Sequence, residues 1–230
     1  MGFQIVNAQS LSPSSKWHWD KGTIVIDTPE RPAGQEHVLG LTAAPIKTVR
    51  VGFVGLGMRG PSAVIRFCQI PGVEIVALCD YEEKRAEAQQ RHLRNAGLAP
   101  AAIYYGEKGY EELCKRPDVD MIYIATDWKH HFPVAKCAME NGKHAAIEVP
   151  SAMNLEQCWD LIDLSEKKRL HCFILENCCY DDYEMKSLLM VQDGIFGEVI
   201  RAEGAYIHEL SEFWQYYWKD PNDNDKDNLH

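Results

Sequence analysis

Residues 49–60 read VRVGFVGLGMRG, a β-branched apolar run that leads directly into a glycine-rich turn. Such a run is typical of a buried strand in a parallel sheet. The turn has the spacing G-x-G-x-x-G, with Gly55, Gly57 and Gly60. At this spacing the first glycine permits the tight turn, the second lets the backbone approach a pyrophosphate, and the third lets helix and strand pack closely. The stretch therefore predicts a strand, a phosphate-binding turn and a helix.

An acidic residue follows this turn at the distance that a dinucleotide site requires. Asp80 ends the next apolar run, 73–80, and stands 20 residues after Gly60. A carboxylate there accepts hydrogen bonds from the adenosine ribose and repels a 2′-phosphate, which favours NAD over NADP. The other interpretation is an ordinary strand-to-helix turn with Asp80 as a surface cap. The flanking strand and helix favour the NAD site.

Outward from this stretch, strand-like and helix-like segments alternate. The strand-like segments are 73–80, 101–105, 120–126, 144–149 and 171–176. The helix-like segments are 61–70, 82–96, 107–116, 131–141, 154–169 and 181–193. This alternation predicts crossovers between parallel strands, and hence an α/β fold with a doubly wound parallel sheet of the Rossmann type.

The same pattern divides the chain into three parts. Residues 1–46 form an arm without clear periodicity, and residues 47–150 form the Rossmann domain, whose last strand and helix extend to about 177. Residues 178–230 begin a further domain, which we expect to be incomplete. Its strand-like run at 198–207 needs a partner strand. We expect that run to be unpaired or to pair with another chain.

Composition excludes several classes of function. Lys and Arg number 24 against 34 Asp and Glu, a formal net charge of −10, and no basic run is present. Nucleic acid and anionic lipid repel such a chain. No stretch approaches the ~20 apolar residues of a membrane helix. We therefore expect neither nucleic acid nor a membrane as a partner.

The eight cysteines indicate a reducing compartment. They form no C-x-x-C pair and mostly lie inside apolar runs, which is typical of buried thiols and not of a disulfide framework or a zinc site. We expect no metal. No leader is visible in residues 1–15, so we expect a cytoplasmic protein. A periplasmic location stays open if a leader was removed.

Two further motifs resemble the Gfo/Idh/MocA oxidoreductase family. They are IYIAT at 122–126, followed by Trp128 and His131, and EVP at 148–150. The resemblance implies a Rossmann domain followed by an α/β domain with an open, largely antiparallel sheet. The common family pattern at the second motif is Glu-Lys-Pro, whose lysine assists proton transfer during hydride chemistry. Val149 replaces that lysine here, which disfavours ordinary alcohol dehydrogenation.

Five motifs between about residues 48 and 218 are more specifically similar to the NAD-dependent glycoside hydrolase family 109 branch, which is α-N-acetylgalactosaminidase-like. They are MR at 58–59, WKHH at 128–131, EV at 148–149, ENCCY at 176–180 and GAYIHEL at 204–210. With the glycines of the turn, the resemblance implies NAD contacts from Met58, Arg59, Asp80, Thr126, Trp128, Lys129, His130, His131, Glu148, Val149 and Asn177. It implies a sugar contact from Tyr206, and a homo-oligomer at full length.

The implied reaction cleaves an α-linked N-acetylhexosamine, N-acetylgalactosamine above all. NAD-dependent glycosidases oxidise the sugar at C3, remove the C2 proton, eliminate the C1 substituent, add water and return the hydride. The proton steps need a group that titrates near neutral pH. His208 is our candidate acid/base, on one strand face with Tyr206. Tyr180, after the strand-like run 171–176, is the second candidate.

Each of these residues also has a structural interpretation. His208 is otherwise a solvated or core-bonded histidine, and Tyr180 a core tyrosine. His130 or His131 caps the helix that we expect to begin there, and Glu148 ends its strand on solvent. We interpret His144 as a surface residue. The aromatic cluster 213–218 is a glycan-facing loop or an apolar cover of the sheet.

Three functions stay open. The first is the NAD-dependent glycosidase, and the second is a conventional NAD-linked sugar or polyol dehydrogenase. The third is a non-catalytic NAD-binding protein or fragment. Val149 favours the first over the second. Because we expect an unfinished substrate domain, we expect these 230 residues to bind NAD but to hydrolyse glycosides poorly or not at all.

Overall fold

The computed structural model describes residues 17–26, 29–205 and 207–209. The chain divides into two compact units, Met1–Ile174 and Leu175–His230. The first contains the parallel sheet and the glycine-rich turn, and the described residues of the second contain one helix. Each unit is described by itself below.

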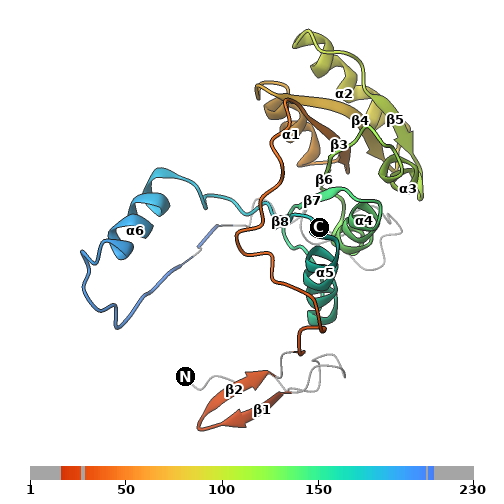
Figure 1. The fold of residues 1–230 in the computed structure, drawn as a ribbon. Coiled ribbons are helices and arrows are strands. Elements are labelled where there is room, and N and C mark those ends of the chain that lie inside the picture. The colour runs from red at the N-terminus through yellow and green to blue at the C-terminus, as the bar shows by residue number, and fades with distance from the viewer. Residues whose placement is uncertain (1–16, 27–28, 206, 210–230) are drawn as a thin grey trace. The chain divides into compact units, whose positions relative to one another are not determined.

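A six-stranded, wholly parallel sheet forms the centre of the first unit (Figure 1). Its order is β5-β4-β3-β6-β7-β8. The strands are β3 (Val49–Val54), β4 (Val73–Asp80), β5 (Ala102–Tyr105), β6 (Met121–Ile124), β7 (His144–Ile147) and β8 (Cys172–Ile174). The order reverses between β3 and β6, which pair directly, and this is the switch point of a doubly wound sheet. The predicted fold class is confirmed.

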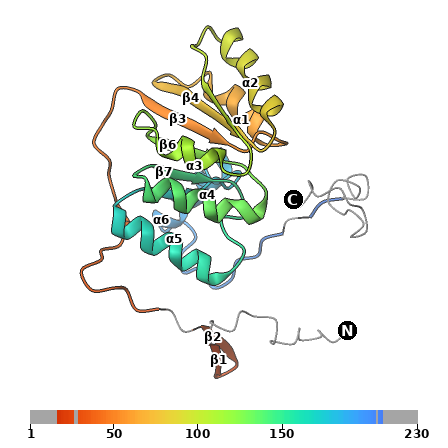
Figure 2. The same ribbon diagram turned by 90° about the vertical axis from the view of Figure 1, so that its right-hand side faces the viewer.

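Helices connect the successive strands and cover both faces of the sheet. They are α1 (Gly60–Phe67), α2 (Glu83–Asn95), α3 (Gly109–Cys114), α4 (Trp128–Glu140) and α5 (Leu155–Lys168). Figure 2 shows α3, α4 and α5 in front of the sheet. The helices α1 and α2 pack against each other and against β4. Right-handed crossovers place them on the opposite face.

The core follows the alternation of side chains along the central strands. Val54, Ile122 and Ile124 are buried on the face that α4 covers, against a set of small and apolar residues. Phe53 and Tyr123 are paired in register on the other face, where α1 packs. Successive side chains of a strand point to opposite faces. The near-continuous apolar runs of the sequence therefore supply both cores.

Two boundaries differ from the sequence-based expectation. The arm contains a hairpin, β1 (Trp17–Asp20) and β2 (Thr23–Ile26), closed by Lys21 and Gly22, both at positive φ. Positive φ at both central positions is the geometry of a tight hairpin turn. The helix expected at 131–141 begins at Trp128, because the carboxylate of Asp127 accepts a hydrogen bond from His130 N and caps it.

The strand expected at 198–207 does not form in the described residues of that range. Residues 198–205 and 207 are irregular, since a strand exists only by pairing and the described part of the second unit offers no partner strand. That unit contains α6 (Asp182–Gln192), and none of its described residues is buried. Tyr206 and the aromatic cluster 213–218 lie outside the described residues.

The eight thiols are free, but not all of them are buried. Cys79 and Cys114 are buried, whereas Cys158, Cys178 and Cys179 are exposed. The expectation of buried cysteines is therefore wrong for these three. Cys158 is on the solvent side of α5, and the other two belong to the second unit, where no described residue is buried.

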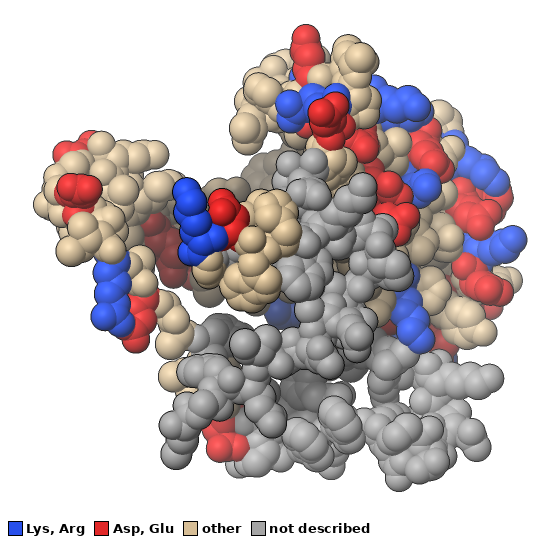
Figure 3. Space-filling view, turned by 90° about the horizontal axis from the view of Figure 1, so that it is seen from below, with Lys and Arg blue, Asp and Glu red and all other residues tan. Residues whose placement is uncertain are grey.

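Charge is distributed evenly on the face shown in Figure 3, where basic and acidic side chains lie among one another. In the described part of the chain, no helix is both long and apolar enough to cross a bilayer.

Candidate functional site

The glycine-rich turn leaves β3 at the switch point, and two of its glycines are required by the backbone around them. Gly55 has φ +92°, and a Cβ there would lie 2.3 Å from the carbonyl oxygen of Ala125. A Cβ on Gly60 would lie 2.1 Å from the carbonyl oxygen of Gly55. Real Cβ atoms do not approach backbone this closely, so the first and third glycines of the motif are needed to fold the turn.

The middle glycine differs, because its surroundings are open. A Cβ on Gly57 would meet only the Arg85 guanidinium, 3.6 Å away, and Gly57 itself is exposed. The N-terminus of α1 begins three residues later, and no side chain caps it in the described structure. An open glycine beside an uncapped helix N-terminus offers N–H donors and room for an anion. This arrangement fits the pyrophosphate of a dinucleotide.

Asp80, at the end of β4, holds the glycine-rich turn through hydrogen bonds to its carboxylate. One carboxylate oxygen accepts a hydrogen bond from Leu56 N at 2.7 Å, and the other accepts from Glu82 N at 3.0 Å. Its residue exposure is only 6%. Arg85 bonds to Glu82 at 2.7 Å and lies 3.8 Å from Asp80. The acid therefore fixes the shape of the turn, a role in addition to the ribose contact predicted for it.

The loop after β6 is fixed by two histidines of different surroundings. The exposed His130 ring lies 2.8 Å from Asp127, the cap of α4. His131 is 1% exposed, and its two ring nitrogens lie 2.6 Å from Pro150 O and 3.0 Å from Thr126 O. A ring N–H can donate to either carbonyl oxygen, so His131 lies between the loop after β6 and the loop after β7 and contacts both.

Glu148 follows β7 directly and is fixed by its backbone and its side chain. Glu148 N donates to Ile124 O at 2.9 Å, and the Tyr123 hydroxyl donates to Glu148 Oε1 at 2.7 Å. Val149, the next residue, is 43% exposed, and the bond from Val149 to Pro150 is cis. The half-buried carboxylate and the exposed valine therefore face the end of the sheet at the switch point.

The structure brings most of the predicted residues to one place, the carboxyl ends of β3, β4, β6 and β7. They are Gly55, Gly57, Met58, Arg59, Gly60, Asp80, Thr126, Trp128, Lys129, His130, His131, Glu148 and Val149. Ligands of open α/β sheets bind at this end, next to the switch point. Of these side chains, Met58 is 60% exposed and Trp128 is 45% exposed, so both are accessible to a ligand.

The remaining predicted residues belong to the second unit. Asn177 and His208 are exposed, and Tyr180 is 88% exposed. The high exposure contradicts the interpretation of Tyr180 as a core tyrosine. Tyr206, the predicted sugar contact, lies outside the described residues.

Two residues with clear roles at this site were not identified from the sequence. Tyr123 lies inside an apolar strand motif, where a tyrosine gives no functional signal. Arg85 lies in a helix rich in charged residues, and only the fold brings it against Gly57. Neither position carried a pattern that could have identified it.

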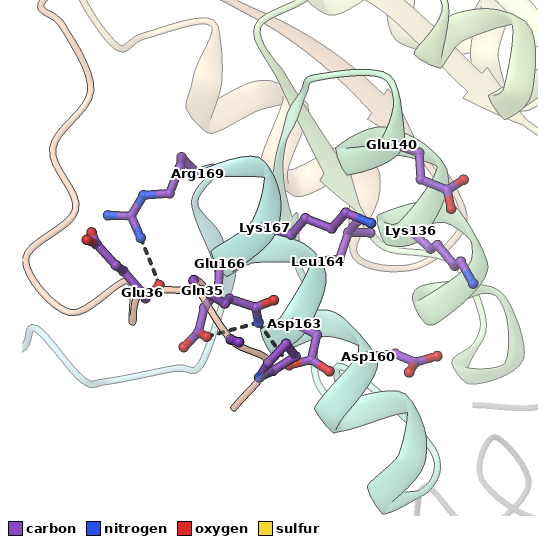
Figure 4. A pocket seen from close by; sticks show the side chains of 13 residues that line it. Gln35, Glu36, Lys136, Glu140, Asp160, Asp163, Leu164, Glu166, Lys167 and Arg169 are labelled. Atoms are coloured by element: carbon purple, nitrogen blue, oxygen red, sulfur yellow. Dashed lines mark hydrogen bonds between the residues drawn. The ribbon is translucent and has the colours of Figure 1, made fainter. Parts of the chain in front are cut away.

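A pocket of the first unit lies elsewhere, between residues 32–36 of the arm and the helices α4 and α5 (Figure 4). Gln35 donates one hydrogen bond to Asp163 and one to Glu166, and Arg31 pairs with Glu166 at 2.9 Å. No residue of the glycine-rich turn lines it. This pocket is an open groove beside residues 32–36 of the arm, lined by both acidic and basic side chains, and it is distinct from the site at the strand ends. Within the described residues, no cluster of three His, Cys, Asp or Glu side chains could hold a metal ion.

Comparison with protein families gives one match that covers more than half of the chain. The Gfo/Idh/MocA model, described as an oxidoreductase family with an NAD-binding Rossmann fold, matches residues 49–175. The matched range contains the parallel sheet and every residue of the site described above.

Curated relatives extend the likeness beyond this domain. Glycosyl hydrolase family 109 protein 3 of Phocaeicola vulgatus is 76% identical over 225 residues, which cover 98% of this chain and 41% of the relative. A glycosyl hydrolase family 109 protein of Porphyromonas gingivalis is 53% identical over 215 residues, 91% of this chain and 46% of the relative. The chain thus spans less than half the length of these relatives.

Among solved structures, myo-inositol dehydrogenase from Lactobacillus casei, in complex with NAD(H) and myo-inositol, has a TM-score of 0.58 and 25% identity. The likeness covers 65% of this chain and 43% of that one. The oxidoreductase KijD10, a 3-ketoreductase from Actinomadura kijaniata, has a TM-score of 0.55 at 22% identity and shares the fold.

Proposed function

The chain belongs to the Gfo/Idh/MocA oxidoreductase family with its NAD-binding Rossmann domain, and from this premise we propose that it serves the NAD-dependent cleavage of glycosides. The observation that carries the proposal is the 76% identity to a glycosyl hydrolase family 109 protein over nearly the whole chain. The substrate that we propose is an α-linked N-acetylhexosamine, with N-acetylgalactosamine the first choice.

The dinucleotide would lie across the carboxyl ends of β3 and β6. In this arrangement Gly57 and the N-terminus of α1 hold the pyrophosphate, and Asp80 meets the adenosine ribose. Glu148 orients the nicotinamide ribose, and the cofactor also contacts the exposed Met58 of the turn and the exposed Trp128 at the start of α4. The open space at Gly57 and the half-buried carboxylate of Glu148 support these assignments.

Bound NAD would take the C3 hydride of the sugar and return it, which is redox chemistry that side chains do not supply. The residues of the chain would handle the protons. Val149 has no proton to exchange, so the position that carries lysine in the common family pattern contributes only apolar surface. We assign the proton steps at C2 and C1 to His208 in the first place and to Tyr180 in the second, in a further domain that begins near residue 178.

The cofactor site is tested by Gly57→Ala. The added methyl group meets no backbone in the protein and Gly57 does not have a left-handed φ, so we expect an unchanged melting temperature. The methyl group would occupy the approach of the pyrophosphate, and we expect the Kd for NAD⁺, measured by calorimetry, to rise at least tenfold. Wild-type affinity in a folded Gly57→Ala variant would contradict the placement of the pyrophosphate.

The reaction is tested with a panel of p-nitrophenyl α- and β-glycosides in the presence and absence of NAD⁺. The family 109 relative of Phocaeicola vulgatus serves as the positive control for the assay. Release of p-nitrophenol from the α-N-acetylgalactosaminide that depends on NAD⁺, with no net NADH, supports the glycosidase. Stoichiometric NADH on a free sugar instead supports a conventional dehydrogenase, the function named for the myo-inositol dehydrogenase neighbour.

A further inference from the structure

Tyr123 has an unusual position for a polar group, because its hydroxyl reaches the site from inside the core. The residue lies in β6 and is 3% exposed. Its hydroxyl donates a hydrogen bond of 2.7 Å to Glu148 Oε1. A buried hydroxyl needs a partner, and hydrogen bonds to a charged partner are the stronger kind. The bond therefore constrains both side chains.

The ring of Tyr123 is held rigidly by two phenylalanines. The Phe53 ring stacks on it with centroids 4.9 Å apart, and the Phe67 ring meets it edge-on at 5.4 Å. Phe53 comes from β3 and Phe67 from α1, so the elements on both sides of the glycine-rich turn fix the ring. Packing of this kind restricts the ring to one orientation.

The strand register carries this rigidity to Glu148. Tyr123 in β6 pairs with Ala146 in β7. Glu148 stands two residues after Ala146, and side chains two residues apart share a face of the sheet. The Glu148 N–H is fixed separately by Ile124 O. With backbone and Oε1 both held, the carboxylate has one orientation, and its second oxygen, Oε2, remains to accept from a ligand.

The proton of this hydrogen bond stays on the tyrosine. Burial raises the pKa of Tyr123 well above its ordinary value, and the nearby Glu148 raises that pKa further, while Arg66 lowers it. The hydroxyl therefore keeps its proton around neutral pH and donates it to the Glu148 side chain.

We propose that Tyr123 is a positioning residue, which aims the Glu148 carboxylate at the nicotinamide ribose through the hydrogen bond from its hydroxyl. This inference rests on the proposed contact between Glu148 and NAD. Tyr123 itself touches no cofactor: it acts only through Glu148. Tyr123 would thereby connect the packing of Phe53 and Phe67 in the core to the position of the nicotinamide half of NAD.

The test is a double-mutant cycle with two ligands. Tyr123→Phe keeps the ring stack and removes only the hydroxyl, and Glu148→Ala removes the acceptor of that hydroxyl together with the carboxylate. Each variant and the double variant are titrated by calorimetry with NAD⁺ and with ADP, which lacks the nicotinamide ribose. Tyr104→Phe in β5, whose hydroxyl accepts from Arg116 at 3.3 Å, is the matched control.

We expect Tyr123→Phe to raise the Kd for NAD⁺ about tenfold and to leave the Kd for ADP within about twofold. On the Glu148→Ala background the second change should add little, since the hydroxyl then has no side chain to position. Tyr104→Phe should change neither Kd.

Three outcomes would overturn the inference while leaving the cofactor site intact. They are wild-type NAD⁺ affinity in Tyr123→Phe, equal losses for NAD⁺ and ADP, and additive losses in the double variant. Wild-type NAD⁺ affinity in Glu148→Ala overturns the proposed Glu148 contact together with this inference. Failure of the wild-type chain to bind either ligand overturns the cofactor site itself.

Discussion

The two ends of the parallel strands use their polar groups differently, although the same strands and helices build both. At the amino ends the polar groups bond to one another. Asp120 accepts three hydrogen bonds from Arg50, at 2.8, 2.9 and 2.6 Å, and His171 N donates to the His144 ring at 2.9 Å. Lys143, buried beside them, donates to Arg116 O at 2.6 Å. This end is closed.

At the carboxyl ends the polar groups hold loops in place and leave a surface open. Asp80 and His131 bond to backbone and are buried, while Met58, Trp128 and Val149 remain exposed. With the cofactor site that we propose, one sheet would separate stability from binding along its strands. Changes at the amino ends should lower the free energy of unfolding, and changes at the carboxyl ends should lower the affinity for NAD⁺.

The largest effect that we predict is a loss of stability from a change at the carboxyl ends, and it is an exception to this rule. Gly60 is at the carboxyl ends, yet a Cβ there would lie 2.1 Å from backbone. Backbone cannot move aside as a flexible side chain can, so Gly60→Ala should lower the free energy of unfolding by about 3 kcal/mol or more. Urea unfolding followed by circular dichroism measures it. Gly57→Ala, in the same motif, should have almost no effect on stability, and equal stabilities of the two variants would refute the distinction.

The next effect sharpens the comparison at the amino ends. Asp120→Ala removes the acceptor of the Arg50 side chain and of the Arg50 N–H. Hydrogen bonds to charged groups contribute about 1.5–3 kcal/mol, and we expect a loss of about 2 kcal/mol in the free energy of unfolding with an unchanged Kd for NAD⁺.

Asp118→Ala is the matched control for this variant. Asp118 pairs with Arg116, but its side chain is 46% exposed, and exposed pairs contribute about 0–1 kcal/mol. A loss as large as that of Asp120→Ala would show that exposure does not decide the effect. A weakened affinity for NAD⁺ in Asp120→Ala would instead show that the two ends are coupled.

A smaller effect at the amino ends depends on pH. Burial lowers the pKa of His144 below its ordinary 6.5, and the neighbouring His171 lowers that pKa further, while Asp120 opposes them. The unfolded chain therefore binds the proton more readily than the folded one. The contribution of His144 to the free energy of unfolding is complete above pH ~6.5, the ordinary pKa of the unfolded chain. It is lost as the pH falls through the lowered pKa of the folded protein.

We test this contribution by comparing urea unfolding of the wild type and of His144→Asn at pH 7.5 and pH 5.5. Asparagine keeps an acceptor for the His171 N–H and does not titrate. We expect the wild type to lose more stability than His144→Asn over this interval, and by less than the Asp120→Ala effect. An identical loss in both proteins would remove His144 from the pH dependence.

His144 also shows where sequence reasoning stops. We interpreted it as a surface residue because it follows the turn 141–143, but it opens β7, and its ring is half-buried and packs against His171 at 5.0 Å. The contact joins two strands that are 27 residues apart in the sequence. Hydrogen bonds between distant segments leave no trace in local patterns.

The fold itself was predictable because its signals are local. Apolar runs mark the parallel strands, the glycine spacing marks the turn, and Asn154, a residue type that favours the N-cap, caps α5. The candidate site was predictable as a location, because strand ends follow from strand positions. What each residue does there was not. The sequence did not indicate that Asp80 bonds to Leu56 N, that His131 is buried between two carbonyl oxygens, or that Tyr123 bonds to Glu148.

The second unit shows the opposite case, in which the local signal correctly predicts a helix but the apolar side chains of that helix are not buried. The helix expected at 181–193 forms as α6, yet its apolar residues, such as Leu188 and Leu189, are about half exposed. The strand expected at 198–207 is absent from the described residues of that range. Periodicity can predict a helix, whose hydrogen bonds are internal, but a strand needs a neighbour that periodicity does not supply.

The smallest effect on stability that we predict separates the carboxyl ends from ordinary surface. Met58 and Leu39 are both exposed apolar residues, at 60% and 83%, and only Met58 lies in the glycine-rich turn. Shortening an exposed side chain changes the free energy of unfolding by less than about 0.5 kcal/mol. Met58→Ala and Leu39→Ala should therefore unfold at nearly the same urea concentration as the wild type. Only Met58→Ala should raise the Kd for NAD⁺, about three- to tenfold, because its side chain loses contact area that forms when the cofactor covers the turn. Equal affinities of the two variants would mean that the exposed methionine is ordinary surface, and that the open end of the sheet binds through its backbone alone.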